Sequence, residues 1–222
     1  MSLTYRLLRA IARFIFRLGT RYEVVGRENL PRGGPLIVAM NHIHLLDSPA
    51  AMAALPWQVT ALAARKWQRH LLGILLRGAG VIFVTRGQAD RRALRRALAL
   101  LAAGGILGVA PEGTRSRDHR LQPARSGVAY LAHLSGAPIL PVAVTGVEHV
   151  PRAWLGLRRA RVRVTLGEPF RLPALDHKPR AAELFEHADL VMRRLADLLP
   201  EEYRGVYSAG GQGIKHRPVP QG

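Results

Sequence analysis

Residues 36–49 have the sequence LIVAMNHIHLLDSP, in which an apolar strand, a polar loop and a helix start follow one another. Leu36–Met40 is an apolar run directly after the turn Gly33–Pro35, which predicts a strand in the interior of a sheet. Ser48 and Pro49 indicate the start of a helix, with Ser48 as its N-cap and Pro49 in its first turn. A strand that leads through a short loop into a helix is the building unit of an α/β domain.

The same alternation continues along the chain. Short apolar runs predict further strands over residues 81–84, 106–110, 139–144 and 161–166, and helical patterns predict helices over 67–76, 90–103 and 179–199. A chain of 222 residues suits one domain. We therefore expect a single α/β domain over residues 22–207, with a central mixed, largely parallel sheet flanked by helices. Residues 208–222 are rich in Gly and Pro, which predicts a flexible tail.

The first 21 residues predict an amphipathic helix. Four arginines lie within an arc of roughly 80°, opposite a face of Leu, Ile and Phe side chains; they are Arg6, Arg9, Arg13 and Arg17. This arrangement is typical of a helix that lies on an anionic membrane surface, although it also fits a helix packed on the domain, and both can hold at once. The apolar stretches are shorter than the roughly 20 residues of a spanning helix or are broken by Gly and Pro, so no transmembrane segment is predicted.

Composition narrows the classes of function. The chain has no cysteine, which excludes disulfides, thiolate zinc sites and a cysteine nucleophile. Its formal net charge is +18, and nearly all of its basic residues are arginines, whose planar guanidinium groups bind phosphate. The charge therefore indicates a phosphate-rich partner, which is a nucleic acid, an anionic lipid or a small phosphate ester.

Polar clusters come directly after predicted strands, at residues 41–47, 85–87 and 111–116. The carboxyl ends of parallel strands meet at one edge of a sheet, where α/β domains bind ligands. His42 and Asp47 are about 140° apart on a continuous helix, so they pair only if the chain folds back. The carboxylate then orients the imidazole and raises its basicity. The alternative is a structural histidine, with Asp47 as a helix cap.

The polar clusters resemble those of a known family. His42-(x)4-Asp47 preceded by Asn41, with the Glu112–Ser116 sequence EGTRS downstream, resembles the glycerol-3-phosphate and 1-acylglycerol-3-phosphate acyltransferases. Residues 80–86 and 139–144 resemble two further blocks of that family. The order and spacing match over residues 22–147.

The resemblance implies roles for individual residues. His42 is expected to take the proton from the acceptor hydroxyl, with Asp47 as its orienter. Arg86 and the segment Glu112, Gly113, Thr114 and Arg115 are expected to bind the acceptor. Arg125 stands where the family has a lysine. For Arg125 and Lys66 we consider two roles, a solvated surface charge and a contact to phosphate.

The resemblance also implies the reaction. A positioned base is needed because an alcohol is a poor nucleophile, whereas a thioester is already activated, so no covalent enzyme intermediate is required. The expected donor is acyl-CoA or acyl-carrier protein, without cofactor or metal, and the expected acceptor is 1-acylglycerol 3-phosphate. Glycerol 3-phosphate or another lysolipid is the alternative acceptor. The expected location is peripheral or monotopic, on the cytoplasmic face of the membrane.

Three other classes of function fit the sequence less well. The residues His42, His44 and Asp47 superficially resemble a metallo-β-lactamase ligand run, but two of four ligand positions differ. A nucleic-acid-binding module fits the charge, but aromatics are only 6% of the chain and no recognition motif appears, so no nucleic acid is expected. A serine esterase would need a G-x-S-x-G elbow, which the sequence lacks.

Overall fold

The computed structural model of the chain describes residues 1–69, 71–85 and 90–209. Its helices are α1 (Leu3–Gly19), α2 (Asp47–Ala54), α3 (Leu71–Gly78), α4 (Arg91–Ala102), α5 (Gly127–Ser135), α6 (Val150–Leu155) and α7 (Ala181–Ala196). Its strands are β1 (Thr20–Val25), β2 (Leu36–Met40), β3 (Thr60–Ala64), β4 (Ile82–Val84), β5 (Ile106–Val109), β6 (Ile139–Thr145) and β7 (Ala160–Leu166). Short 3₁₀ turns lie among them.

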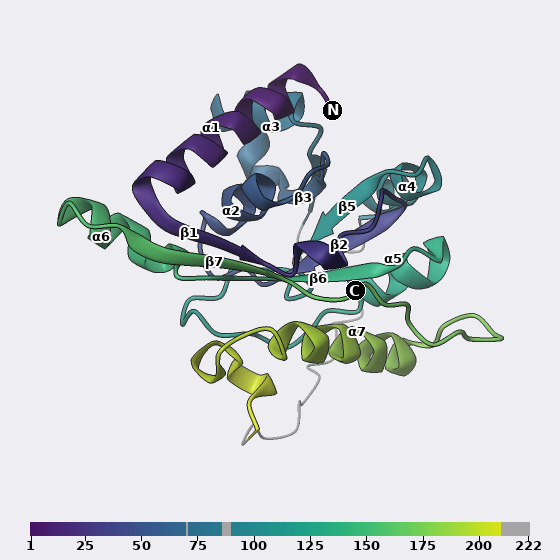
Figure 1. Ribbon diagram of the computed structural model, residues 1–222. Helices are drawn as coiled ribbons and strands as arrows, with labels where there is room; N and C mark the ends of the chain where they lie inside the picture. The colour runs from purple at the N-terminus through teal and green to yellow at the C-terminus, as the bar shows by residue number, and fades with distance from the viewer. Residues whose placement is uncertain (70, 86–89, 210–222) are drawn as a thin grey trace.

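The strands form one sheet in the order β1-β7-β6-β2-β5-β3-β4 (Figure 1). Every neighbouring pair is parallel except β6 and β7, which are antiparallel. The expected single α/β domain with a mixed, largely parallel sheet is therefore confirmed. Because β2, β5 and β6 lie side by side and run parallel, the loops that follow them open at the same edge of the sheet.

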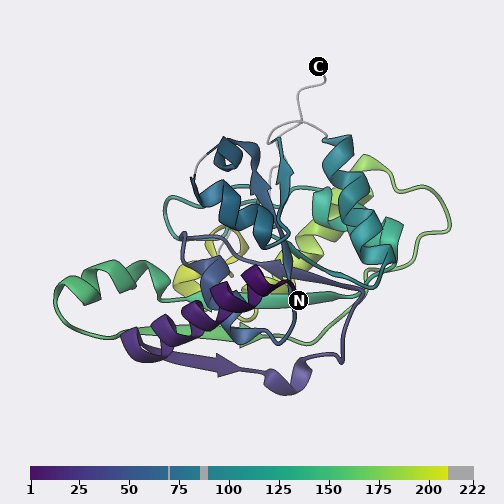
Figure 2. The same ribbon diagram turned by 90° about the horizontal axis from the view of Figure 1, so that it is seen from above.

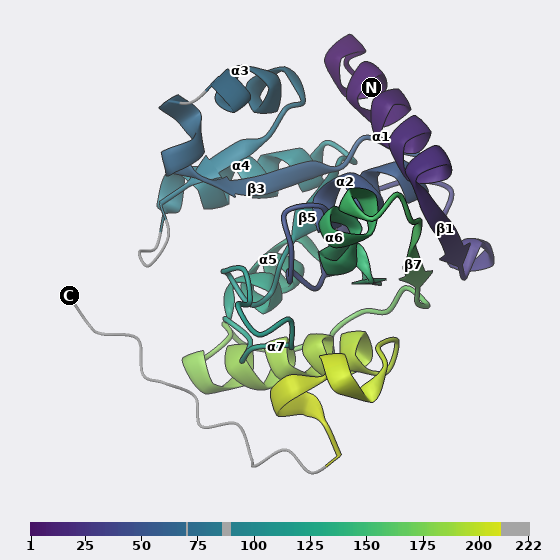
Figure 3. The same ribbon diagram turned by 90° about the vertical axis from the view of Figure 1, so that its left-hand side faces the viewer.

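The central strand β2 is buried at all five positions, because helices cover both of its faces. Successive side chains of a strand alternate between faces. Ile37 and Ala39 accordingly join a core with α4, α5 and α7, whereas Leu36, Val38 and Met40 join a second core with α1 and α2. Figure 3 shows α1 and α7 on opposite sides of the sheet. The unbroken apolar run of the sequence thus corresponds to a strand between two helical layers.

The helix α1 packs on the domain through a narrow face. Ala12 and Phe16 join the second core, Tyr5 is buried nearer the start of the helix, and Arg13 Nε donates to the Ala53 carbonyl at 3.0 Å. The predicted apolar face points elsewhere and remains largely exposed; Leu8 is half-buried, whereas its other members, Leu7, Ile11, Phe14, Ile15 and Leu18, are exposed. Packing on the domain therefore leaves the amphipathic surface free.

Some predicted boundaries differ in the structure. The boundary expected between residues 21 and 22 lies inside β1, because α1 continues into that strand. The strands β1 and β3 were not predicted, and the helix expected over 67–76 is divided between a 3₁₀ turn and α3. Residues 210–222, most of the predicted tail, lie outside the described residues. Within the described ranges, no helix combines the length and the apolar character that crossing a membrane demands.

Candidate functional site

The loop after β2 folds back on itself around one carboxylate. Oδ2 of Asp47 lies 3.2 Å from His42 Nδ1 and accepts the backbone N–H groups of Ile43 and His44, each at 2.7 Å. The helix α2 begins at Asp47, with Leu46 at the N-cap position. The prediction of Ser48 as the N-cap is therefore wrong, because the helix already begins one residue before Ser48. The Asp47 side chain accepts N–H groups of the preceding loop.

The environment of Asp47 determines its ionisation. Its side chain is 0% exposed, and this burial is the largest influence and raises its pKa. The hydrogen bonds from His42 and from the backbone of the loop act in the opposite direction and lower the pKa. Its second oxygen, Oδ1, has no hydrogen-bond partner in the described structure. The imidazole is therefore the one side-chain donor to a largely buried carboxylate.

The His42 ring is partly accessible, with a side chain that is 21% exposed. A carboxylate oxygen only accepts, so the Asp47 pairing places the proton of a neutral imidazole on Nδ1. Nε2 makes no hydrogen bond to any residue that the structure describes. In this tautomer Nε2 carries no proton and can accept a hydrogen bond.

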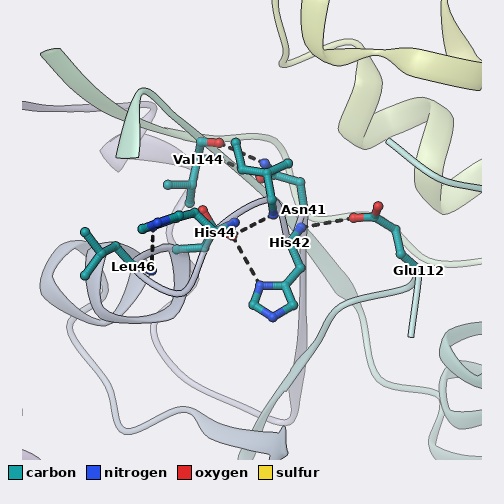
Figure 4. A network of polar contacts seen from close by, with 8 residues as sticks. Asn41, His42, His44, Leu46, Glu112 and Val144 are labelled. Atoms are coloured by element: carbon teal, nitrogen blue, oxygen red, sulfur yellow. Dashed lines mark hydrogen bonds and ion pairs between the residues drawn. The ribbon is translucent and has the colours of Figure 1, made fainter. Parts of the chain in front are cut away.

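The loop after β5 holds the backbone of His42 from both sides. Oε1 of Glu112 accepts the His42 N–H at 3.0 Å (Figure 4), and the His42 carbonyl accepts the Ser116 N–H at 2.8 Å. The predicted meeting of the first and third polar clusters at one edge of the sheet is thus found in the hydrogen bonds. These contacts fix the peptide groups that orient the His42 ring.

Glu112 lies inside the protein, with only 2% of its surface exposed. Its second oxygen, Oε2, accepts the Gln122 N–H at 3.0 Å, so each carboxylate oxygen receives one backbone donor. Burial, assisted by the negative charges of Asp47 and Asp118, raises the pKa of Glu112 to about 7. Both carboxylate oxygens of Glu112 thus bind backbone N–H groups, one of which belongs to His42.

Asn41 is a positioning residue whose role was not predicted from its place before His42. Its buried amide donates to the Val144 carbonyl and accepts the Val144 N–H, both at 2.8 Å (Figure 4). The side chain thereby extends the pairing of β2 and β6 by one step beyond the last strand residue. An asparagine directly after an apolar strand and directly before the histidine was the available signal.

The other predicted residues occupy different places. Gly113 has a positive φ of 69°, and a Cβ there would lie 2.5 Å from the Arg125 side chain, so glycine is required. Thr114 and Arg115 are exposed on the same loop, and the Arg125 N–H donates to the Pro111 carbonyl at 2.9 Å. Lys66 lies in the 3₁₀ turn after β3, with its ammonium over the Trp67 ring. Arg86 lies outside the described residues.

Two hollows in the described structure lie away from the His42 loop, and His42 lines neither of them. The smaller, about 250 Å³, lies at the carboxyl ends of β3 and β4 and is lined by Arg65, Gln68, Phe83, Asp90, Arg92 and Arg96. The larger, about 990 Å³, lies over β1, β7 and the end of α7. Among residues 1–69, 71–85 and 90–209, no group of three His, Asp or Glu side chains has a metal-binding arrangement.

Comparisons of sequence and of structure both find acyltransferases among the proteins similar to this chain. A family profile described as Acyltransferase matches residues 21–145, from β1 to the end of β6. The chain is 23% identical over 196 residues to a 1-acyl-sn-glycerol-3-phosphate acyltransferase of Bacillus subtilis, covering 87% of this chain and 96% of that protein. It is 29% identical over 191 residues to a lyso-ornithine lipid O-acyltransferase of Pseudomonas aeruginosa, covering 78% and 71%. The crystal structure of the 1-acyl-sn-glycerophosphate acyltransferase PlsC of Thermotoga maritima matches with a TM-score of 0.67 and 25% identity, covering 87% and 79%.

Proposed function

The chain belongs to the acyltransferase family, and we propose that it moves a fatty acyl group from a thioester to 1-acylglycerol 3-phosphate, which gives phosphatidic acid. The observation that carries the proposal is the hydrogen bond between His42 and the buried Asp47, within a loop that Glu112 and Ser116 hold in place. The names of the Bacillus and Thermotoga relatives support this acceptor.

In the proposed reaction, Nε2 of His42 takes the proton from the acceptor hydroxyl as its oxygen attacks the thioester carbonyl. Asp47 holds the ring and compensates the positive charge that develops on it. The new ester C–O bond forms, the C–S bond breaks, and the departing thiolate takes the proton from the imidazolium. A thioester is reactive enough for this direct transfer, so we propose no acyl-enzyme and no cofactor.

The donor in this proposal is acyl-CoA or acyl-carrier protein, and the reaction takes place at the cytoplasmic face of a membrane. The exposed apolar face of α1, which Arg6 and Arg17 border, supports peripheral contact with an anionic lipid surface. Both substrates with acyl chains then reach the enzyme from the bilayer or from solution beside it.

The acceptor is tested directly with purified protein, a labelled acyl thioester and a panel of acceptors, with products separated by thin-layer chromatography. We expect 1-acylglycerol 3-phosphate to be the preferred acceptor. Preference for a phosphate-free lysolipid would instead support the alternative that the Pseudomonas relative's name suggests. Preference for glycerol 3-phosphate would support the other alternative.

Arg115 is the exposed arginine that directly precedes Ser116, whose N–H donates to the His42 carbonyl, and we assign it to the acceptor phosphate. A charge-assisted hydrogen bond is worth about 1.5–3 kcal/mol, so Arg115→Ala should raise the acceptor KM by roughly 10- to 100-fold and change kcat little. Steady-state kinetics with varied 1-acylglycerol 3-phosphate measures both constants. Arg117→Ala, an exposed arginine of the same loop, is the matched control, and an unchanged KM in Arg115→Ala would remove Arg115 from this role.

Glu112 is a positioning residue in this proposal, since its oxygens are occupied by backbone N–H groups. In Glu112→Gln, the amide NH₂ faces one of the two backbone donors, so the link from the His42 N–H through residue 112 to the Gln122 N–H is broken at one end. We expect kcat to fall by about 10-fold or more, with little change in acceptor KM. A variant in which the acceptor KM rises and kcat stays constant would instead indicate direct acceptor binding by Glu112.

The same variant has a pH signature. Because the pKa of Glu112 is raised in the folded state to about 7, the folded state binds more protons than the unfolded state between the ordinary value and that pKa. Stability should therefore fall by about 3 kcal/mol as the pH rises through this window, and Glu112→Gln should remove that fall. Urea unfolding at pH 5 and pH 8 measures it, with the exposed Glu186→Gln as control.

The lipid contact of α1 is tested by surface substitution, because deletion of α1 would remove the buried Tyr5 and Phe16. The exposed side chains of Leu7 and Phe14 each gain about 1.5–3 kcal/mol when buried, so Leu7→Glu/Phe14→Glu should weaken binding to anionic vesicles by about 100-fold or more. Vesicle co-sedimentation measures the partition, and undiminished binding would discard this face as the lipid contact.

A further inference from the structure

The connection between β6 and β7 carries apolar side chains that no other part of the described structure covers. It contains α6 and ends in the sequence Leu155–Gly156–Leu157. Leu155 is 89% exposed and Leu157 is 98% exposed, and the neighbouring Trp154 is also exposed. Leu157 has a positive φ of 51°, a backbone conformation that is rare for a leucine. We name residues 150–158 the α6 wing.

The α6 wing is fastened to the end of the amphipathic helix. Trp154 Nε1 donates to the Gly19 carbonyl at 2.7 Å, and Arg159, directly after the wing, donates from Nη2 to the carbonyls of Arg17 and Thr20, each at 2.6 Å. These carbonyls belong to the last turn of α1 and its C-cap, which have no partner within the helix itself. In Figures 1 and 2 the wing lies beside the C-terminal end of α1. These hydrogen bonds join the wing to the C-terminal end of α1.

The charges around the wing favour one class of partner. Arg152 and Arg158 are exposed beside the leucines, and no ion pair involving either is found within the described ranges. Exposed leucines flanked by arginines suit the interface of an anionic bilayer. There the leucine side chains enter the acyl region and the guanidinium groups remain at the phosphates. An apolar protein partner would leave these cations without counter-charges.

We propose that the α6 wing is a second membrane-insertion site, in which Leu155 and Leu157 enter an anionic bilayer next to α1. This inference rests on the proposed function, because it takes α1 to lie on the same membrane. A single helix that lies on a bilayer remains free to roll about its own axis. A second contact to the bilayer, to one side of α1, prevents the protein from rotating about the axis of α1. It thereby sets the direction in which the His42 loop faces the lipid surface.

The test compares vesicle binding with catalysis. Leu155→Glu/Leu157→Glu should weaken binding of the full chain to phosphatidylglycerol-containing vesicles by about 10-fold or more. Its acyl transfer to substrates dispersed in detergent should stay unchanged, so loss of the wing is distinguished from failure of the proposed reaction. Leu134→Glu, on α5 and 51% exposed, is the matched control. Vesicle binding equal to that of the control would overturn the proposal.

A second measurement uses the intrinsic fluorophore of the wing. In Trp57→Phe/Trp67→Phe, Trp154 is the one remaining tryptophan of the chain. Lipids brominated on their acyl chains should quench its emission when vesicles are added, and the quenching should disappear in the variant that also carries Leu155→Glu/Leu157→Glu. Emission that brominated vesicles leave unchanged would overturn the proposal.

Discussion

Replacement of His42 by alanine is expected to lower kcat for acyl transfer by about 10²- to 10⁴-fold, the range that a positioned general base supplies. The ring is the one side chain that pairs with the buried Asp47, and its Nε2 has no other partner in the described structure. The fold should persist, because the His42 backbone makes the contacts to Glu112 and Ser116. Initial rates with labelled thioester, together with circular dichroism, measure both quantities.

Two other histidines serve as controls for this substitution. His44 lies in the same loop, where its Nδ1 accepts the Leu46 N–H at 3.3 Å, and His44→Ala should cost much less than His42→Ala. His177 forms another His–Asp hydrogen bond, to Asp176 at 2.7 Å, in the exposed segment before α7, and His177→Ala should leave the rate unchanged. Equal losses in His42→Ala and His44→Ala would reject His42 as the specific base.

Replacement of Asp47 by asparagine is the second large effect that we expect, a fall in kcat of about 10²- to 10⁴-fold. An amide removes the negative charge that stabilises the imidazolium and permits the wrong tautomer of the ring. The amide oxygen still accepts backbone N–H groups from Ile43 and His44, so the loop retains part of its support. KM for both substrates should change little, which separates this loss from a loss of binding.

The matched control for Asp47→Asn is Asp176→Asn, which changes the other His–Asp pair in the same way. We expect the control to retain the rate of the unmodified enzyme. A folded Asp47→Asn protein with more than a third of the original kcat would show that the buried carboxylate has a structural role only.

The layers of the fold could be predicted from the sequence where hydrophobic pattern alone decides the structure. The run Leu36–Met40 is apolar throughout because both faces of its strand are buried, and it was recognised on that basis. The strands β1 and β3 escaped prediction for opposite reasons. Glu23 and Arg21 break the apolar character of β1, and β3 (sequence TALAA) is rich in alanine, which favours helices over strands.

Adjacency at the site was predictable, but the direction of individual side chains was not. Parallel strand ends bring His42 and the Glu112–Ser116 loop together, as the order of motifs indicates. Whether a glutamate in such a loop faces substrate or protein depends on which backbone N–H groups need an acceptor. Here the N–H groups of His42 and Gln122 both donate to Glu112, so its side chain points into the protein. Spacing alone likewise could not show that α2 begins at Asp47, whose carboxylate accepts N–H groups of the preceding loop, and not after Ser48.

The most direct test of the central claim is a double-mutant cycle between His42 and Asp47. Asp47 is proposed to act only through the imidazole, so the two losses should not multiply. We predict that His42→Ala/Asp47→Asn has the same kcat as His42→Ala, within about twofold. A double variant slower than His42→Ala by the full factor that Asp47→Asn causes on its own would contradict the claim that the two side chains act as one catalytic unit.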